Sequence, residues 1–326
     1  MPDPQRTPAP RHAWFHPGLI ATLVLALLAL TQSPTGIAAQ SATPVAANAC
    51  ADPGLVPAPD VPEGVSASTP SALYGVDVAT GDAIQSVIEA LASCLTAGDA
   101  ETVTVLVTDR YLADAYGGGE RMTKEDYLAL APSAAVIPVT VVSIGQINFT
   151  GSDTASAQVI TVQGNQLRTE EWTFLFRPSR STAATPTAAG EGHWLVHQVA
   201  LQTPSIPSEA TQATATETDG KITISPATIA GPDVVFTVKN TGDEAHEFLV
   251  LRLVDGATIE ELIRPTGDGF PDNMQVIGQE TIPAGESRSL VFVDLAPGEY
   301  TVVCLLPDAD GVPHLALGES ATFMVS

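Results

Sequence analysis

Residues 297–319, PGEYTVVCLLPDADGVPHLALGE, indicate the architecture of the C-terminal region most clearly. The segment opens on a Pro297-Gly298 turn and continues through a β-branched run, which places Cys304 at the end of a predicted strand. Nine residues separate Cys304 from His314, and the loop between them contains two prolines and a glycine that would stiffen it. One loop between adjacent strands can therefore present a thiolate at its start and an imidazole at its end to the same point.

A second histidine, His246, lies 58 residues before Cys304, just after a strand and turn predicted over 234–243. A thiolate and two imidazoles form a soft donor set that binds copper strongly, and also zinc. The alternative is that Cys304 is a plain core residue and that the histidines are ordinary polar residues of a metal-free sandwich.

The region from Lys221 to the C-terminus is predicted to be all β. Short strands separated by turns are expected at 222–224, 234–239, 247–254, 287–293, 300–305 and 320–325. Six or more short strands in about one hundred residues favour an antiparallel β-sandwich.

Several short motifs of this region follow one another in a characteristic order. They are Asn240-Thr241-Gly242, His246-Glu247-Phe248, Pro297-Gly298-Glu299-Tyr300, Cys304, His314 and Gly318. Through them, residues 221–326 resemble the plastocyanin and azurin (blue copper, or cupredoxin) family. The resemblance implies a Greek-key sandwich that holds one copper ion, with His246, Cys304 and His314 as equatorial ligands. The loop from Cys304 onward is longer than in plastocyanin and is nearer to the ligand loop of copper nitrite reductases.

One position departs from that family. Glu319 directly follows Gly318, where the family usually has an axial methionine. A carboxylate is a harder donor, so a bound Glu319 would favour Cu(II) and lower the reduction potential. If Glu319 does not bind, the fourth position is open or filled by water.

The N-terminal domain, predicted over 72–203, has a different pattern. Apolar residues at helical spacing predict a helix over 84–99, and further helical pieces extend to residue 131. Strands are then expected at 139–149, 155–163, 167–176 and 193–202. Helices followed by an antiparallel sheet make an α+β domain.

This order resembles the SnoaL-like or nuclear-transport-factor-2-like family. The resemblance implies a cone-like fold in which helices and a curved sheet enclose a pocket for a small ligand or a reaction. Enzymes with this fold use an Asp or His in the pocket as a general base, for which Asp114, Asp126 and His197 are the candidates.

The first forty residues are predicted to be a signal peptide. Basic residues precede a short apolar run, LIATLVLALLAL over 19–30, and small residues follow it. The run is shorter than the roughly 20 residues of a transmembrane helix, although an uncleaved anchor is the alternative. We therefore expect a secreted or extracytoplasmic protein. Residues 41–71 are predicted to be a flexible leader, and the Thr-, Ala-, Ser- and Pro-rich segment 204–220 a linker.

The chain has three cysteines, an odd number for an exported protein. Cys50 and Cys94 both lie in the N-terminal half and are the natural disulfide pair. Cys304 is then left as a thiol that is either buried and inert or bound to metal.

The acidic composition limits the partners. The formal net charge is −24, which disfavours nucleic acid and anionic membrane surfaces, so we expect no nucleic-acid partner and no membrane contact beyond the signal segment. Three hypotheses remain. The first is a copper protein that transfers electrons to a redox partner protein or carries copper. The second is a metal-free extracellular binding protein, and the third is small-ligand binding or catalysis in the N-terminal domain. The sequence favours an electron-transfer or binding protein over an enzyme.

Overall fold

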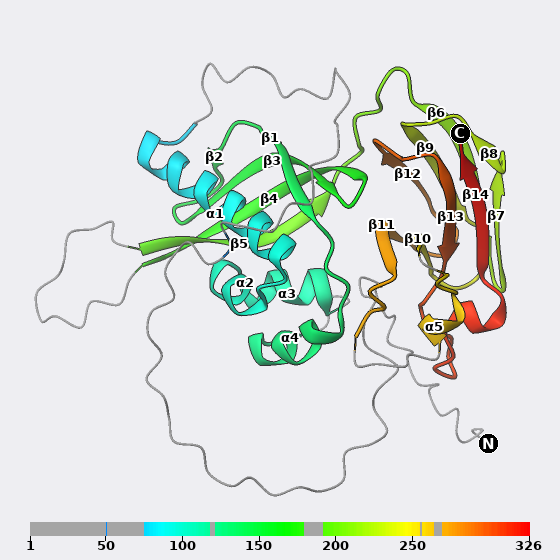
Figure 1. The fold of residues 1–326 in the computed structure, drawn as a ribbon. Coiled ribbons are helices and arrows are strands. Elements are labelled where there is room, and N and C mark those ends of the chain that lie inside the picture. Colours follow the sequence, from blue (N-terminus) through cyan, green and yellow to red (C-terminus); the bar gives the residue numbers. More distant parts are fainter. Residues whose placement is uncertain (1–49, 51–74, 118–120, 179–191, 255, 264–268) are drawn as a thin grey trace, which may run out of the picture.

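The computed structural model describes residues 50, 75–117, 121–178, 192–254, 256–263 and 269–326 (Figure 1). The predicted signal peptide, 1–40, lies outside the described residues, as does the predicted leader, 41–71, apart from Cys50. Within the described ranges, no helix is long and apolar enough to cross a membrane.

Helices form the first part of the described chain. They are α1 (Val78–Ala97), α2 (Ala100–Leu106), α3 (Asp109–Tyr116), α4 (Lys124–Leu130) and the 3-10 turn η1 (Ala131–Ser133). The Asp77 carboxylate accepts from the Thr80 amide and caps α1, and Gly98 ends it in the left-handed conformation at φ 67°. Ile84, Ile88 and Leu91 are fully buried, because their spacing places them on one face of α1.

An antiparallel sheet follows the helices. Its strands are β1 (Val139–Ile144), β2 (Asn148–Phe149), β3 (Thr154–Gln163), β4 (Gln166–Pro178) and β5 (Gly192–Leu201). The helices pack on one face of this sheet, and the core between them includes Phe174 and Val196 (Figure 1). The order of helices and strands agrees with the predicted α+β class, whereas a cone that encloses a pocket stays a prediction.

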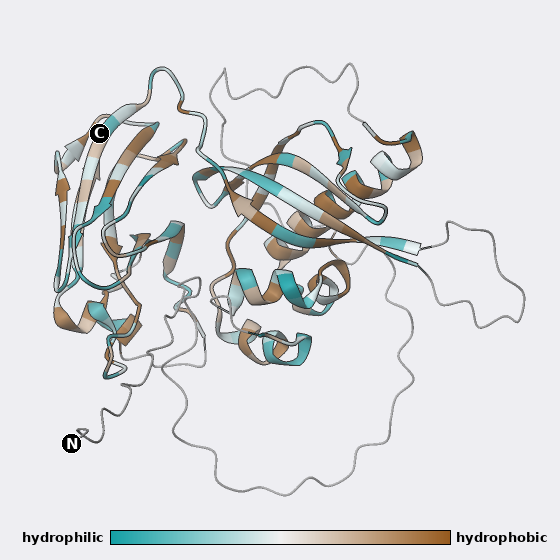
Figure 2. Ribbon diagram, turned by 180° about the vertical axis from the view of Figure 1, so that it is seen from behind, coloured by the Kyte–Doolittle hydropathy of each residue, from teal (hydrophilic) through white to brown (hydrophobic). Residues whose placement is uncertain are grey.

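The C-terminal part is a sandwich of two sheets. Its elements are β6 (Thr211–Thr218), β7 (Lys221–Ser225), β8 (Thr228–Ile229), β9 (Val234–Asn240), β10 (His246–Leu253), α5 (Glu260–Ile263), β11 (Met274–Ile282), β12 (Ser287–Phe292), β13 (Gly298–Val303), η2 (His314–Leu317) and β14 (Ser320–Val325). One sheet has the order β12-β9-β6-β7 and the other β11-β10-β13-β14-β8. Phe236 touches Phe248, Phe292 and Phe323 between the sheets, and hydrophobic residues occupy long parts of these strands (Figure 2).

The prediction of a linker over 204–220 is wrong for Thr211–Thr218. This segment is strand β6, which pairs with β7 antiparallel and with β9 in parallel. Its inward residues are Ala213, Ala215 and Glu217, all buried. Two alanines and a glutamate give a weak hydrophobic alternation, so the sequence pattern did not predict a strand here.

The two predicted domains share one sheet. Strand β12 pairs with β9 on one side and with β4 on the other, so the N-terminal strands and one sheet of the sandwich form a continuous nine-stranded sheet. The amide of Asn165, in the β3–β4 turn, donates to the Ile277 carbonyl at 2.7 Å. Arg168 of β4 lies 3.2 Å from the Glu280 carboxylate of β11. Backbone pairing and a largely buried ion pair therefore join the two parts.

Candidate metal centre

Four side chains meet at one end of the sandwich. His246 begins β10, Cys304 follows β13, His314 begins η2 and Glu319 precedes β14. Strands β10, β13 and β14 are antiparallel neighbours, so the start of β10, the end of β13 and the start of β14 lie at the same end of the sandwich. Each residue offers one donor atom, and these four atoms lie within 4.8 Å of one another. All four side chains are at most 2% exposed.

The sulfur of Cys304 lies inside this cluster. Its Sγ is 3.3 Å from Nδ1 of His314 and accepts the Glu247 amide at 3.2 Å. Burial raises the pKa of the Cys304 thiol well above its ordinary value, and the nearby Glu247 carboxyl raises it further. A thiolate at this position therefore needs a bound cation to stabilise it.

The Glu319 carboxylate lies between the two imidazoles. Its Oε2 is 2.8 Å from Nδ1 of His246 and 3.4 Å from Nδ1 of His314. Despite the short distance, neither His246 Nδ1 nor Glu319 Oε2 has a hydrogen-bond partner of suitable geometry among the described residues. Buried polar atoms without partners are rare, and these two face a common point with the sulfur beside them.

The outward-facing polar atoms of the two imidazoles and of the Glu319 carboxylate each contact another group of the protein. Nε2 of His246 lies 3.1 Å from Asp219 Oδ1, and Nε2 of His314 lies 3.1 Å from Glu244 Oε2. The Gly220 amide donates to Oε1 of Glu319 at 2.6 Å. Each outer atom is thus satisfied, while Nδ1, Nδ1, Sγ and Oε2 point inward. This arrangement of two imidazoles, a thiol and a carboxylate fits a single transition-metal ion.

In the metal-free cluster, the Glu319 carboxylate and the two imidazoles shift one another's pKa values. Burial would raise the pKa of Glu319, but the two imidazoles and the Gly220 amide outweigh burial and lower it to about 2. Burial would lower the pKa of His246, yet Glu319 raises it overall, and Glu319 likewise raises the pKa of His314. A carboxylate here favours positive charge between the rings, which is the electrostatic condition for holding a cation.

The sequence did not indicate the groups behind these side chains. Asp219 and Gly220 form the β6–β7 turn, inside the segment predicted as linker, and Glu244 lies in the β9–β10 connection. An Asp-Gly pair is a hairpin signal and was the available clue to a turn at this position. Nothing in the sequence pattern indicated that this turn contacts His246 or Glu319.

Cys50 and Cys94 form a disulfide with their Cα atoms 4.9 Å apart. Together with Asp99 they make a second group of metal-binding residue types, but the sulfurs are bonded to each other and are not free to ligate. Cys304 is the free cysteine of the described residues and is fully buried.

The three candidate bases of the N-terminal domain each contact a neighbouring group of the fold. Asp114 pairs with exposed Arg110 at 2.7 Å, one helical turn away. Asp126 completes the capping box of α4 with Thr123. Nδ1 of His197 lies 3.0 Å from the Thr108 hydroxyl. Each residue has a local structural partner, and Asp114 and Arg110 of α3 also act electrostatically on His197 of β5.

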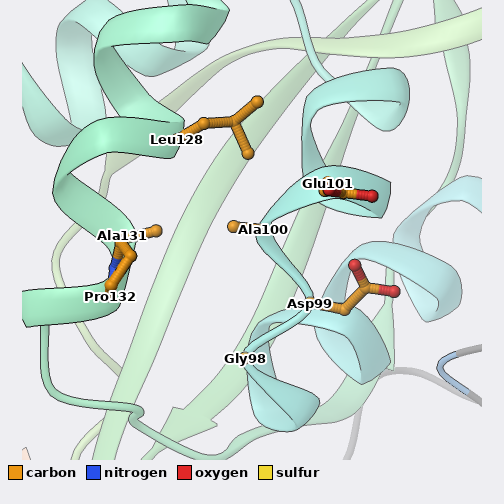
Figure 3. Close-up of a pocket in the computed structure, with 7 residues that line it drawn as sticks. All are labelled: Gly98, Asp99, Ala100, Glu101, Leu128, Ala131 and Pro132. Carbon is orange, nitrogen blue, oxygen red and sulfur yellow. The ribbon is translucent and has the colours of Figure 1, made fainter. Parts of the chain in front are cut away.

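A shallow pocket lies between the α1–α2 junction and the α4–η1 segment (Figure 3). It is lined by residues 98–101 together with Leu128, Ala131 and Pro132, and it contains none of the three candidate bases. The Asp99 side chain accepts from the Thr102 amide and caps α2.

No protein-family model and no curated protein sequence matches this chain. Among solved structures, it is similar to dithionite-reduced auracyanin from Roseiflexus castenholzii, with 21% identity over 36% of this chain and 98% of that chain, at a TM-score of 0.26. Auracyanin B has 20% identity over 38% and 93% of the two chains, at 0.27. A multicopper oxidase from Aquifex aeolicus has 11% identity over 58% and 49%, at 0.23. These three TM-scores are all below 0.5.

Proposed function

We propose that this chain is an extracytoplasmic copper protein that holds one copper ion through His246, Cys304, His314 and Glu319. The observation that supports this most strongly is the pair of buried atoms His246 Nδ1 and Glu319 Oε2, which lie 2.8 Å apart without hydrogen-bond geometry beside the Cys304 sulfur. Their outer counterparts are satisfied, so the inward donors have a cation as their natural partner.

The donor types favour copper over harder metals. A thiolate with two imidazoles suits Cu(I) and Cu(II), while the carboxylate adds a hard donor that favours Cu(II). Bound copper would supply a one-electron couple. The chain's own contribution is a buried site with ligands from the ends of β10, β13 and β14 and from η2, which limits rearrangement between the oxidation states.

Electron transfer to a redox partner protein, or simple carriage of copper, is the role that such a site would serve. The predicted signal peptide over 1–40 supports export, and the Cys50–Cys94 disulfide is typical of an oxidising compartment. The net charge of −24 favours a partner with a basic surface.

Metal competition tests the proposal. The purified protein is titrated with Cu(II), Cu(I) and Zn(II) against chelators of known affinity, together with His314→Ala and His193→Ala. His193 is an exposed histidine of β5 and serves as the matched control. We expect one copper per chain in the wild type and in His193→Ala, and weaker binding in His314→Ala. Tight binding of zinc alone, or equal copper uptake by all three proteins, would contradict the proposal.

A further inference from the structure

We propose that Asp219 is a positioning residue for copper binding, because it orients the His246 ring with Nδ1 toward the metal centre. The inference rests on the proposed copper site and assigns a role to the β6–β7 turn, which lies outside the four ligands.

The contact between Asp219 and His246 defines which ring nitrogen bears a proton. Oδ1 of Asp219 lies 3.1 Å from Nε2 of His246. An ionised carboxylate only accepts hydrogen bonds, so this contact favours the proton on Nε2, because Glu319 Oε2, 2.8 Å from Nδ1, has no hydrogen-bond geometry to that atom. In a neutral ring, Nδ1 then keeps its lone pair, and Nδ1 is the atom that faces Glu319 and the rest of the cluster.

The Asp219 carboxylate is itself held in place. The Asp243 amide donates to both of its oxygens, at 3.1 and 3.2 Å. The next residue, Gly220, donates its amide to Oε1 of Glu319. One turn therefore orients two of the four proposed ligands, His246 through a side chain and Glu319 through the backbone.

Gly242 provides the space for this contact. A Cβ at residue 242 would overlap Oδ1 of Asp219 and lie 2.8 Å from Nε2 of His246. A methyl group at this position would have to push the carboxylate and the ring apart. Gly242→Ala thus disturbs the same hydrogen bond as a change of Asp219, while leaving the charge of Asp219 intact.

The substitution Asp219→Asn tests the role at nearly constant volume. An asparagine amide can donate to Nε2, which would move the ring proton to Nδ1 and place it where the metal should be. We expect copper binding to weaken by about 10- to 100-fold, the usual cost of losing such a partner behind a ligand. The exposed Asp310→Asn removes the same charge from the loop between Cys304 and His314 and should weaken binding by no more than about fivefold.

Two measurements on the full chain test whether Asp219 orients the His246 ring for copper binding. Copper dissociation constants are measured by chelator competition for wild type, Asp219→Asn, Gly242→Ala and Asp310→Asn. Imidazole 15N spectra of the metal-free proteins, at a pH where the rings are neutral, report the His246 tautomer. We expect Nε2–H in wild type and Nδ1–H in Asp219→Asn, with weaker binding in both Asp219→Asn and Gly242→Ala.

The role is overturned if Asp219→Asn binds copper like Asp310→Asn, or if the His246 tautomer is the same with and without the carboxylate. A wild type that binds no copper refutes the proposed function instead. In that case the spectra of the metal-free protein still show whether Asp219 sets the tautomer, so the two failures are distinguishable.

Discussion

Replacing Glu217 by glutamine should remove a pH dependence from the stability of the metal-free protein. Glu217 lies on the inward face of β6 and is fully buried, and neither carboxylate oxygen has a hydrogen-bond partner among the described residues. Burial raises its pKa from 4.5 to about 8; nearby His246 opposes this rise and Glu319 adds to it. The folded protein therefore keeps this proton at pH values where the unfolded chain has lost it.

The sign and size of this pH dependence follow from the linkage between proton binding and folding. Below pH 4.5 both states are protonated, so Glu217 has no effect on the pH dependence there. Between pH 4.5 and 8 the folded state binds one more proton than the unfolded state, so the free energy of unfolding falls as pH rises, by about 1.4 kcal/mol per pH unit. From pH 5 to pH 7 the contribution of Glu217 is a loss of about 3 kcal/mol.

Urea unfolding at pH 5, 6 and 7, with a chelator present, measures this contribution. The difference in free energy of unfolding between wild type and Glu217→Gln should shrink or reverse by about 3 kcal/mol across that range. Any constant cost of a buried amide cancels in this comparison. The exposed Glu299→Gln is the matched control and should give a pH profile parallel to that of wild type. Parallel profiles for Glu217→Gln would refute the reasoning.

Three further predictions concern the ion pair, the disulfide and Glu319. Arg168→Met leaves the Glu170 and Glu280 carboxylates without the cation that they share at the junction of the two parts and should cost about 3–5 kcal/mol in urea unfolding; a loss below about 1 kcal/mol would contradict this. Changing both Cys50 and Cys94 to serine opens a link across 44 residues and should cost about 4 kcal/mol, which an unchanged thermal midpoint would disprove. Glu319→Met replaces a hard donor by a soft one and should raise the copper reduction potential in protein-film voltammetry, whereas an unchanged potential would show that Glu319 does not touch the metal.

The local parts of the candidate site were predictable from sequence. Cys304 and His314 belong to one loop between neighbouring strands, so their spacing alone places them near each other. Glu319 ends the same loop. His246 required the further inference that β10 lies beside β13, which depended on the resemblance of residues 221–326 to the blue copper family.

The long-range parts were not predictable. Asp219 contacts His246 across 27 residues because β6 joins the sandwich, and the Ala213 and Ala215 face of β6 is too small to give a strong strand signal. The shared sheet depends on pairing between β4 and β12, two strands more than 100 residues apart. A sequence pattern shows which face of a strand is buried, but not which edge it will meet.

Copper content with the visible and electron-spin spectra of the loaded protein tests the central claim most directly. Wild type should take up one copper per chain and show sulfur-to-copper absorption together with a mononuclear Cu(II) signal, and Cys304→Ser should lose that absorption. If wild type takes up no copper, or if Cys304→Ser gives the same spectrum, then His246, Cys304, His314 and Glu319 do not form a copper site.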